Sequence, residues 1–237
     1  MATFGTFLAA PAFSQVHVET DANLLTAIDE SASVGRHGEW LQYNGLVRAL
    51  LSPRFLDAVR RSGKHGRIGF GIVAWSSHGN VRVVLPWIVI ASEADAFRAA
   101  VVVEQASRAR RAPWEDEDET GRAAPDDPAG SHTDISATIE AATGFVVTAP
   151  FEGDRGVVNI LANGRDNFGV GPGSASRRAV SLGLTINGVI FGDDRGLADY
   201  FQLHVIGGPG SFVETVDEDP RRFGDMMVRK FLRDLLW

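Results

Sequence analysis

The segment from Arg67 to Trp75 is an almost unbroken run of apolar residues. A strand that lacks alternation between apolar and polar side chains is typical of a sheet covered on both faces. Strand-like segments and segments with helical periodicity then alternate along most of the chain. We therefore expect an α/β fold, in which a doubly wound, Rossmann-like sheet carries helices on both faces.

The expected elements account for most of the chain beyond residue 20. We expect strands at 24–28, 67–75, 81–90, 157–162, 185–191 and 212–215. We expect helices at 39–51, 53–61, 93–110, 134–147, 174–182 and 197–204, and a last helix from Pro220. Because 237 residues are at the upper end of single-domain size, residues 20–237 are predicted to form one domain.

The strand at 81–90 contains Pro86, which cannot donate a hydrogen bond to a neighbouring strand. Proline within a sheet is confined to edge strands and bulges. Only the turn-forming segment 76–80 separates this strand from the apolar run 67–75. We therefore expect a hairpin whose second strand is an antiparallel edge, and hence a mixed central sheet.

The composition excludes several classes of function. The formal net charge of −7 argues against a nucleic-acid-binding surface. The absence of cysteine excludes disulfides, thiolate metal sites and cysteine nucleophiles. No apolar run approaches the roughly 18 residues that a membrane span requires, so we expect no membrane span.

Residues 1–14 are expected to lie outside the domain. The first ten residues are mostly small or apolar, and the segment Ala10 to Gln15 resembles the small-residue end of a secretory signal. Because no positive charge follows Met1, we expect either a clipped or atypical signal peptide or a loose arm. The first interpretation, which we favour, predicts a periplasmic or secreted protein.

The segment 111–131 interrupts the alternation of strands and helices. It contains an acidic run from Glu115 to Glu119, followed by Pro125 and Pro128. This composition predicts a solvated, mobile insertion. Trp114 lies beside the carboxylate cluster, and in the alternative interpretation it is a partner-binding residue.

Asp29, Ser31 and Ser33 form an Asp-x-Ser-x-Ser triplet directly after the apolar strand 24–28. Open α/β sheets place their ligands at the carboxyl ends of strands. Convergent carboxylate and hydroxyl oxygens are what a hard cation such as Mg²⁺ requires. Aspartate and serine are equally good turn and N-cap residues, so the triplet alone leaves a metal site and a simple cap as alternatives.

The triplet resembles the metal-ion-dependent adhesion site (MIDAS) motif of von Willebrand factor A domains. A narrower resemblance covers nearly the whole chain beyond residue 20, to a bacterial family of secreted von Willebrand A-like proteins with no assigned function. It is carried by Trp40–Gln42, Ala74–Trp75, Pro86–Ile90, Thr133–Ile135, Ile186–Gly188 and above all Leu203–Val213. The resemblance implies a von Willebrand A-type domain.

The resemblance also implies a set of ligands for Mg²⁺, or for Mn²⁺ or Ca²⁺. In von Willebrand A domains the two serines and a later threonine bind the cation through their hydroxyls, and the threonine matches Thr133 here. A second aspartate of the family is replaced by Asn163. With Asp29 as the only carboxylate, a cation is expected to bind weakly and to attract acidic groups strongly, or the site is vestigial. Asp166 is expected to reach the site through water.

Two further stretches were weighed for chemistry. The glycine-rich segment Gly169–Ser174 fits neither the phosphate-loop nor the dinucleotide motif, and we expect a tight turn with Ser174 as an N-cap. His204 is expected to be a hydrogen-bonded core histidine rather than a base. No Gly-x-Ser-x-Gly elbow and no zinc-protease motif is present.

Two function classes follow from these patterns. The first is a non-enzymatic binding module that engages a carboxylate of a protein partner, with no catalytic residue. Its site residues are Asp29, Ser31, Ser33, Thr133 and Asn163, and its secondary partner-binding candidates are Trp114 and Asp166. The alternative is a metal-dependent hydrolase on a Rossmann-like scaffold, for which Glu30 and Asp166 are the only nearby candidate bases.

Overall fold

The computed structural model describes residues 18–77, 79–111, 132–192 and 194–236. Its centre is a six-stranded sheet in the order β4-β3-β2-β6-β7-β8. The strands are β2 (Ala22–Asp29), β3 (Ile68–Trp75), β4 (Val81–Ile90), β6 (Gly156–Ala162), β7 (Leu184–Phe191) and β8 (Val213–Val216). Neighbouring strands are parallel except β3 and β4, which are antiparallel. The predicted mixed sheet with one antiparallel edge strand is confirmed.

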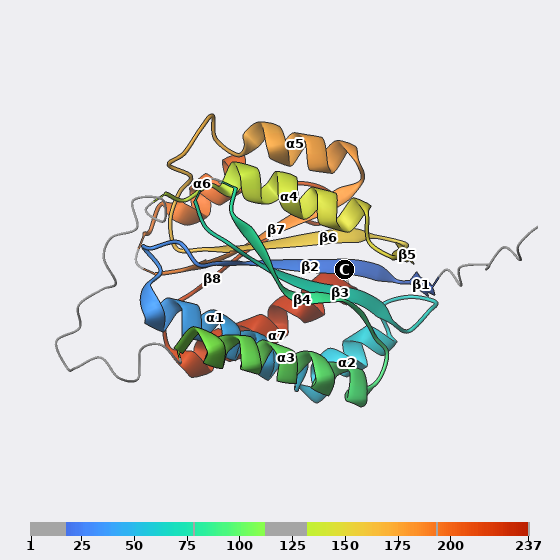
Figure 1. Ribbon diagram of the computed structural model, residues 1–237. Coiled ribbons are helices and arrows are strands. Elements are labelled where there is room, and N and C mark those ends of the chain that lie inside the picture. Colours follow the sequence, from blue (N-terminus) through green and yellow to red (C-terminus); the bar gives the residue numbers. More distant parts are fainter. Residues whose placement is uncertain (1–17, 78, 112–131, 193, 237) are drawn as a thin grey trace, which may run out of the picture.

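Helices cover both faces of this sheet (Figure 1). One face carries α1 (Gly35–Leu50), α2 (Pro53–Arg60), α3 (Glu93–Arg111) and α7 (Pro220–Leu236), and the other carries α4 (Ile135–Val147), α5 (Gly173–Ser181) and α6 (Leu197–His204). Every residue of β3 is buried, as its continuous apolar sequence predicts. The sheet therefore separates two apolar cores.

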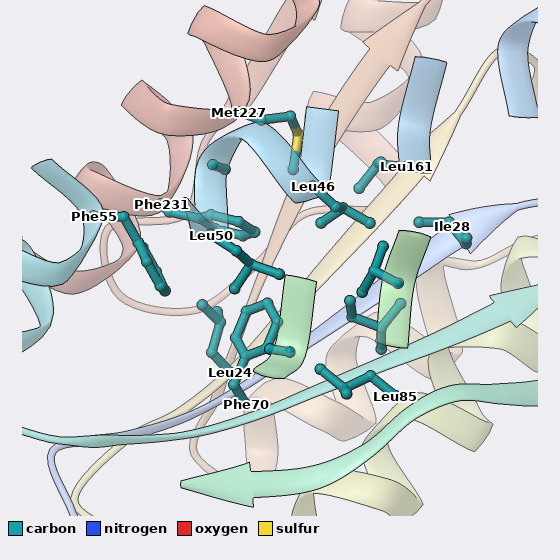
Figure 2. Close-up of a cluster of buried hydrophobic side chains, with 14 of the residues drawn as sticks. Leu24, Ile28, Leu46, Leu50, Phe55, Phe70, Leu85, Leu161, Met227 and Phe231 are labelled. Atoms are coloured by element: carbon teal, nitrogen blue, oxygen red, sulfur yellow. The ribbon is translucent and has the colours of Figure 1, made fainter. Parts of the chain in front are cut away.

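The larger core lies between the sheet and the helices α1, α2, α3 and α7. Figure 2 shows Leu24 and Phe70 of the sheet facing Leu50, Phe55 and Phe231 of the helices. The rings of Phe55, Phe70 and Phe231 pack with centroids 5.5 to 6.2 Å apart. This packing holds the helix layer against the central strands β2 and β3.

The edge strand β4 accommodates Pro86 through a β-bulge. The register with β3 shifts so that Pro86 and Trp87 lie opposite the single residue Gly71. At a bulge the proline does not remove a ladder hydrogen bond. The prediction that the strand containing Pro86 lies at an edge of the sheet is thus confirmed.

Two short strands were missed by the sequence patterns. β1 (Val18–Thr20) and β5 (Phe151–Gly153) form a separate parallel pair beside the amino-terminal ends of β2 and β6 (Figure 1). Strands of three residues are too short for an alternation to be recognised. The pair brings the loops at this end of the sheet together.

The glycine-rich segment after α6 makes a tight turn against β7. Gly207 forms an antiparallel bridge with Ile186. Gly208 has a φ of +91°, and a Cβ there would lie 2.5 Å from the carbonyl oxygen of Leu184. Only glycine combines this backbone conformation with so close an approach.

Parts of the predicted organisation remain predictions. The arm at 1–14 and the insertion, including Trp114, lie outside the described residues, apart from Arg111 at the end of α3. Among the helices of the described segments, none has the length and apolar character needed to span a membrane.

Candidate metal centre at the carboxyl end of the sheet

Asp29 is the last residue of the central strand β2, and it is completely buried. Its Oδ1 accepts a hydrogen bond from the Ser31 N–H at 2.8 Å. Its Oδ2 is buried and has no hydrogen-bond partner among the described residues. A buried carboxylate oxygen without a partner is costly, so this atom calls for a cation, a proton or a water molecule.

The turn after β2 brings the two serine hydroxyls of the triplet together. The Oγ atoms of Ser31 and Ser33 lie 3.1 Å apart, with Ser31 buried and Ser33 exposed. The Ser33 hydroxyl donates to Asn163 Oδ1 at 3.1 Å, and Asn163 Nδ2 donates to the Ser33 carbonyl at 2.9 Å. Residues separated by 130 positions thus form one polar cluster that reaches solvent.

Thr133 adjoins this cluster from the loop before α4. A Cβ on Gly164 would lie 3.9 Å from Thr133 Oγ1, which places the hydroxyl beside the loop that carries Asn163. The Thr133 N–H donates to Asn167 Oδ1 at 2.8 Å, and the Asn167 N–H donates to the Thr133 carbonyl at 3.0 Å. These bonds fix the two loops to each other at the carboxyl end of β6.

Asp166 is directed at main-chain amides. Its Oδ2 accepts from the Ser136 N–H at 2.9 Å in the first turn of α4, and its Oδ1 accepts from the Phe168 N–H at 3.0 Å. Partial burial raises the pKa of Asp166 against the lowering effect of these bonds. That Asp166 reaches a cation through water stays a prediction.

Gln42 is a site residue to which the sequence patterns assigned no role. This fully buried side chain of α1 forms two hydrogen bonds with the main chain of Asp29, at 2.8 and 2.7 Å. A glutamine within a helix has no local signature for such a contact. It could be found only from the packing of α1 on β2.

Glu30 is held in a network on the other side of β2. Its Oε1 accepts from the Tyr43 hydroxyl at 2.7 Å and from Arg82 Nη2 at 2.7 Å. Arg82 also donates to the Tyr43 hydroxyl at 3.1 Å. The carboxylate of Glu30 therefore anchors α1 and the edge strand β4 to the end of β2.

The donor set fits a hard cation. Burial raises the pKa of Asp29 to about 7, although hydrogen bonds from Ser31 act in the opposite direction. A divalent cation beside Oδ2 would remove the cost of ionising this carboxyl. The neighbouring oxygens of Ser31, Ser33, Asn163 and Thr133 are hydroxyl and amide oxygens, which suit Mg²⁺, Mn²⁺ or Ca²⁺.

Two predictions outside this cluster were wrong. His204, expected in the core, is exposed at the end of α6, where its ring lies beside that of Tyr200, and the residues that follow it, Val205 and Ile206, are the buried ones. Ser174, expected as an N-cap, lies within α5, and Pro172 occupies the cap position without a side-chain hydrogen bond.

Comparison with models of protein families matches residues 19–115 and 118–236 to a family described as "Protein of unknown function (DUF1194)". Comparison with curated proteins finds no match.

Similar solved structures carry von Willebrand A domains. One is proximal thread matrix protein 1 from the mussel byssus with a zinc-occupied MIDAS motif, with a TM-score of 0.58, 16% identity and coverage of 93% of this chain and 49% of that chain. Another is the von Willebrand factor type A protein from Catenulispora acidiphila, with a TM-score of 0.55, 15% identity and coverage of 90% and 42%. The VWA domain of SpRpn10 gives a TM-score of 0.54, 10% identity and coverage of 87% and 93%. The chain spans about half the length of the mussel protein's chain, and identities this low show the fold alone.

Proposed function

From the premise that the chain belongs to the DUF1194 family and has a von Willebrand A-type fold, we propose that it is a non-enzymatic module that binds a protein partner through a cation. The observation that carries this proposal is the unpaired, buried Oδ2 of Asp29 beneath a cluster of hydroxyl oxygens. Asp29, Ser31, Ser33, Thr133 and Asn163 would hold Mg²⁺, or Mn²⁺ or Ca²⁺. The cation would supply an electrophilic position for an acidic group.

The charge of the site supports an acidic group as the ligand. Asp29 contributes one carboxylate, and Asn163 contributes a neutral amide where a second aspartate would complete the charge. A divalent cation held by this set keeps about one uncompensated positive charge. Ser33 is exposed at the rim, so a carboxylate presented by a partner could approach from solvent. We therefore propose an acidic side chain of a protein as the ligand.

The contacts of the candidate bases support binding over hydrolysis. Glu30 is ion-paired with Arg82 at 2.7 Å and also accepts from Tyr43. Both oxygens of Asp166 accept from main-chain amides near the start of α4. A general base has to be in reach of the proton that it removes. The carboxylates of Glu30 and Asp166 instead accept hydrogen bonds from other groups of the protein.

We extend the proposal to a periplasmic or secreted location. It is supported by the small-residue segment Ala10 to Gln15, which precedes the described residues. Fractionation of the organism that encodes the chain, with detection of the protein and mass measurement of its mature form, tests it. We expect the protein outside the cytoplasm with its amino terminus near Gln15, and a protein confined to the cytoplasm would contradict the proposal.

Metal-dependent capture tests the function. The immobilised protein is exposed to an envelope extract with Mg²⁺ or with a chelator. We expect a protein to be retained only with Mg²⁺, lost with Asp29→Ala, and kept with Asp57→Ala, which removes an exposed carboxylate on α2. Metal-dependent turnover of phosphoesters or peptides with a defined pH–rate profile would instead favour the hydrolase.

A further inference from the structure

A second cluster of metal-ligating side chains lies at the opposite end of β2. Asp21 immediately precedes β2, His65 lies in the loop between α2 and β3, and Asp154 lies between β5 and β6. One potential ligand atom from each residue lies within 4.8 Å of the others. Because β2 separates Asp21 from Asp29, the two clusters are roughly 26 Å apart.

One ring nitrogen of His65, Nε2, lacks the hydrogen bond that a buried polar atom requires. The His65 side chain is only 10% exposed, and its Nε2 is buried without a hydrogen-bond partner among the described residues. Nε2 faces Asp154 Oδ2 at 3.8 Å, and Nδ1 faces Glu19 Oε2 at 3.8 Å. Both distances are too long for a hydrogen bond. The buried Nε2 is thus an unused ligand atom directed at a carboxylate.

The separation between His65 Nε2 and Asp154 Oδ2 is close to the one that a shared metal ion requires. Bonds of about 2.0 to 2.2 Å to zinc place neighbouring tetrahedral ligands about 3.3 to 3.6 Å apart. The 3.8 Å between His65 Nε2 and Asp154 Oδ2 needs only a small rotation of Asp154, whose side chain is 48% exposed. Lys64 pairs with the other oxygen of Asp154, Oδ1, at 3.4 Å.

Asp21 is fixed in position and held ionised. Its Oδ1 accepts from the His65 N–H at 2.7 Å, and its Oδ2 accepts from the Ser62 hydroxyl at 3.0 Å and the Arg67 N–H at 3.2 Å. Burial acts to raise the pKa of Asp21, but these hydrogen bonds outweigh it, so the pKa is lowered. The loop closes over the carboxylate at Gly63, where a Cβ would lie 2.4 Å from Oδ1.

We propose that Asp21, His65 and Asp154 bind a zinc-class transition-metal ion at the amino-terminal end of the sheet. The imidazole selects such an ion over Mg²⁺ and Ca²⁺, and the two carboxylates balance its charge. Glu19 Oε2 lies 3.8 Å from the remaining ring nitrogen, Nδ1, on the side where a carboxylate commonly orients a metal-bound histidine. The ion links the loop before β3 and the turn before β6 to the start of β2. It thereby stabilises the end of the sheet opposite the Asp29 site.

Calorimetric titration with ZnCl₂ tests the proposal. The titration uses the Asp29→Ala protein, so that the Asp29 site cannot contribute and the outcome is independent of the proposed partner binding. We expect one Zn²⁺ per chain, and an affinity at least about tenfold lower after His65→Gln or Asp154→Asn. The matched control His204→Gln, at an exposed histidine of α6, should leave the affinity unchanged.

Circular dichroism in chelator shows whether each variant is folded. Asp154 is half exposed, so Asp154→Asn tests the site even if His65→Gln does not fold. Absence of Zn²⁺ binding to the Asp29→Ala protein would overturn the proposal. Binding that is unchanged in the folded ligand variants would overturn it as well, since the ion would then lie elsewhere.

Discussion

The side-chain amide of Gln42 pairs with both main-chain groups of Asp29. The Asp29 N–H donates to Gln42 Oε1 at 2.8 Å, and Gln42 Nε2 donates to the Asp29 carbonyl at 2.7 Å. The pairing of β2 with β6 ends at Ala27, and the Glu30 N–H donates to Trp75 of β3. The main chain of Asp29 therefore faces β6 beyond the last paired residues, Ala27 and Ile160, and Gln42 of α1 replaces the missing strand partner.

Replacing Gln42 by leucine should destabilise the protein, because both hydrogen bonds to the main chain of Asp29 are lost. Gln42→Leu leaves a buried N–H and a buried carbonyl of Asp29 without partners. Because each such group costs about 1 to 3 kcal/mol, the free energy of unfolding should fall by about 2 to 4 kcal/mol. Urea denaturation measures it. The control Gln105→Leu, on the exposed face of α3, should change stability little; equal effects of the two variants would contradict the role of Gln42.

Asn163→Asp should increase the affinity for Mg²⁺ by about tenfold or more, because carboxylates dominate the affinity for hard cations. The change is nearly isosteric, but it places a negative charge near Asp29 and removes the donor to the Ser33 carbonyl. The variant should be less stable in chelator and gain more stability from Mg²⁺. Thermal melts with Mg²⁺ and with chelator measure both effects.

The charge-matched control is Asn80→Asp, at the exposed turn between β3 and β4. It should leave the Mg²⁺ response unchanged. If it raises the response as much as Asn163→Asp, the effect is a general one of negative charge at this end of the sheet, and Asn163 is not a ligand.

The stability of the metal-free protein should decrease as the pH rises from about 5 to 8. Burial raises the pKa of Asp29 to about 7, above the value of 3.8 expected when unfolded. Between these values the folded state binds the extra proton, so the contribution of Asp29 falls with rising pH, by on the order of 3 kcal/mol. Urea denaturation of the wild type and of Asp29→Asn, both in chelator, measures the contribution of Asp29 to this pH dependence. An identical pH dependence for both proteins would show that the pKa of Asp29 is not raised in the folded state.

The same titration should govern metal binding. Below about pH 7 a cation has to displace the proton of Asp29, so Mg²⁺ affinity should increase with pH and level off above that pKa. Calorimetric titrations at pH 5.5 to 8.5 measure this dependence, with pH values chosen to bracket the pKa of about 7. A pH-independent affinity would mean that Asp29 does not contact the ion.

The fold was predictable because its signals are local. The apolar run of β3 and the proline of β4 predict a covered sheet with an antiparallel edge, and both features are present. The triplet Asp29, Ser31 and Ser33 also marks its own site, since the three residues are neighbours in sequence. Thr133 and Asn163 came only from the family resemblance, because no spacing links them to the triplet.

The remaining features depend on tertiary packing. The contact of Gln42 with Asp29 requires α1 to dock on β2. The cluster around His65 joins segments that are separated by most of the chain, and it depends on the three-residue strands β1 and β5. No periodicity or motif indicates either arrangement, so the structure was needed to find them.

A buried ion pair under β6 and β7 should be important for stability. Lys230 Nζ donates to both oxygens of Asp234 at 2.6 and 2.8 Å, and the pair is fully inaccessible. Asn159 and Asn187 also donate to this carboxylate, each at 2.9 Å. Lys230→Met leaves a buried charge unpaired and should cost about 3 to 5 kcal/mol in urea denaturation.

The double variant Lys230→Met/Asp234→Asn should be more stable than Lys230→Met alone, because it also removes the unpaired charge. Arg233→Met, one position from Asp234 but partly exposed, serves as a control and should cost much less. A double variant that is less stable than Lys230→Met would show that the carboxylate does not depend on the lysine.

Anomalous diffraction from crystals grown with Mn²⁺ tests the central claim most directly. The account predicts a peak beside Asp29 Oδ2, among the hydroxyls of Ser31, Ser33 and Thr133, in the wild-type protein and no peak there in Asp29→Ala. A wild-type map without density at this position, from crystals that contain Mn²⁺, would contradict a metal-dependent site. The polar groups would then only hydrogen-bond one another, and partner binding would have to use another surface.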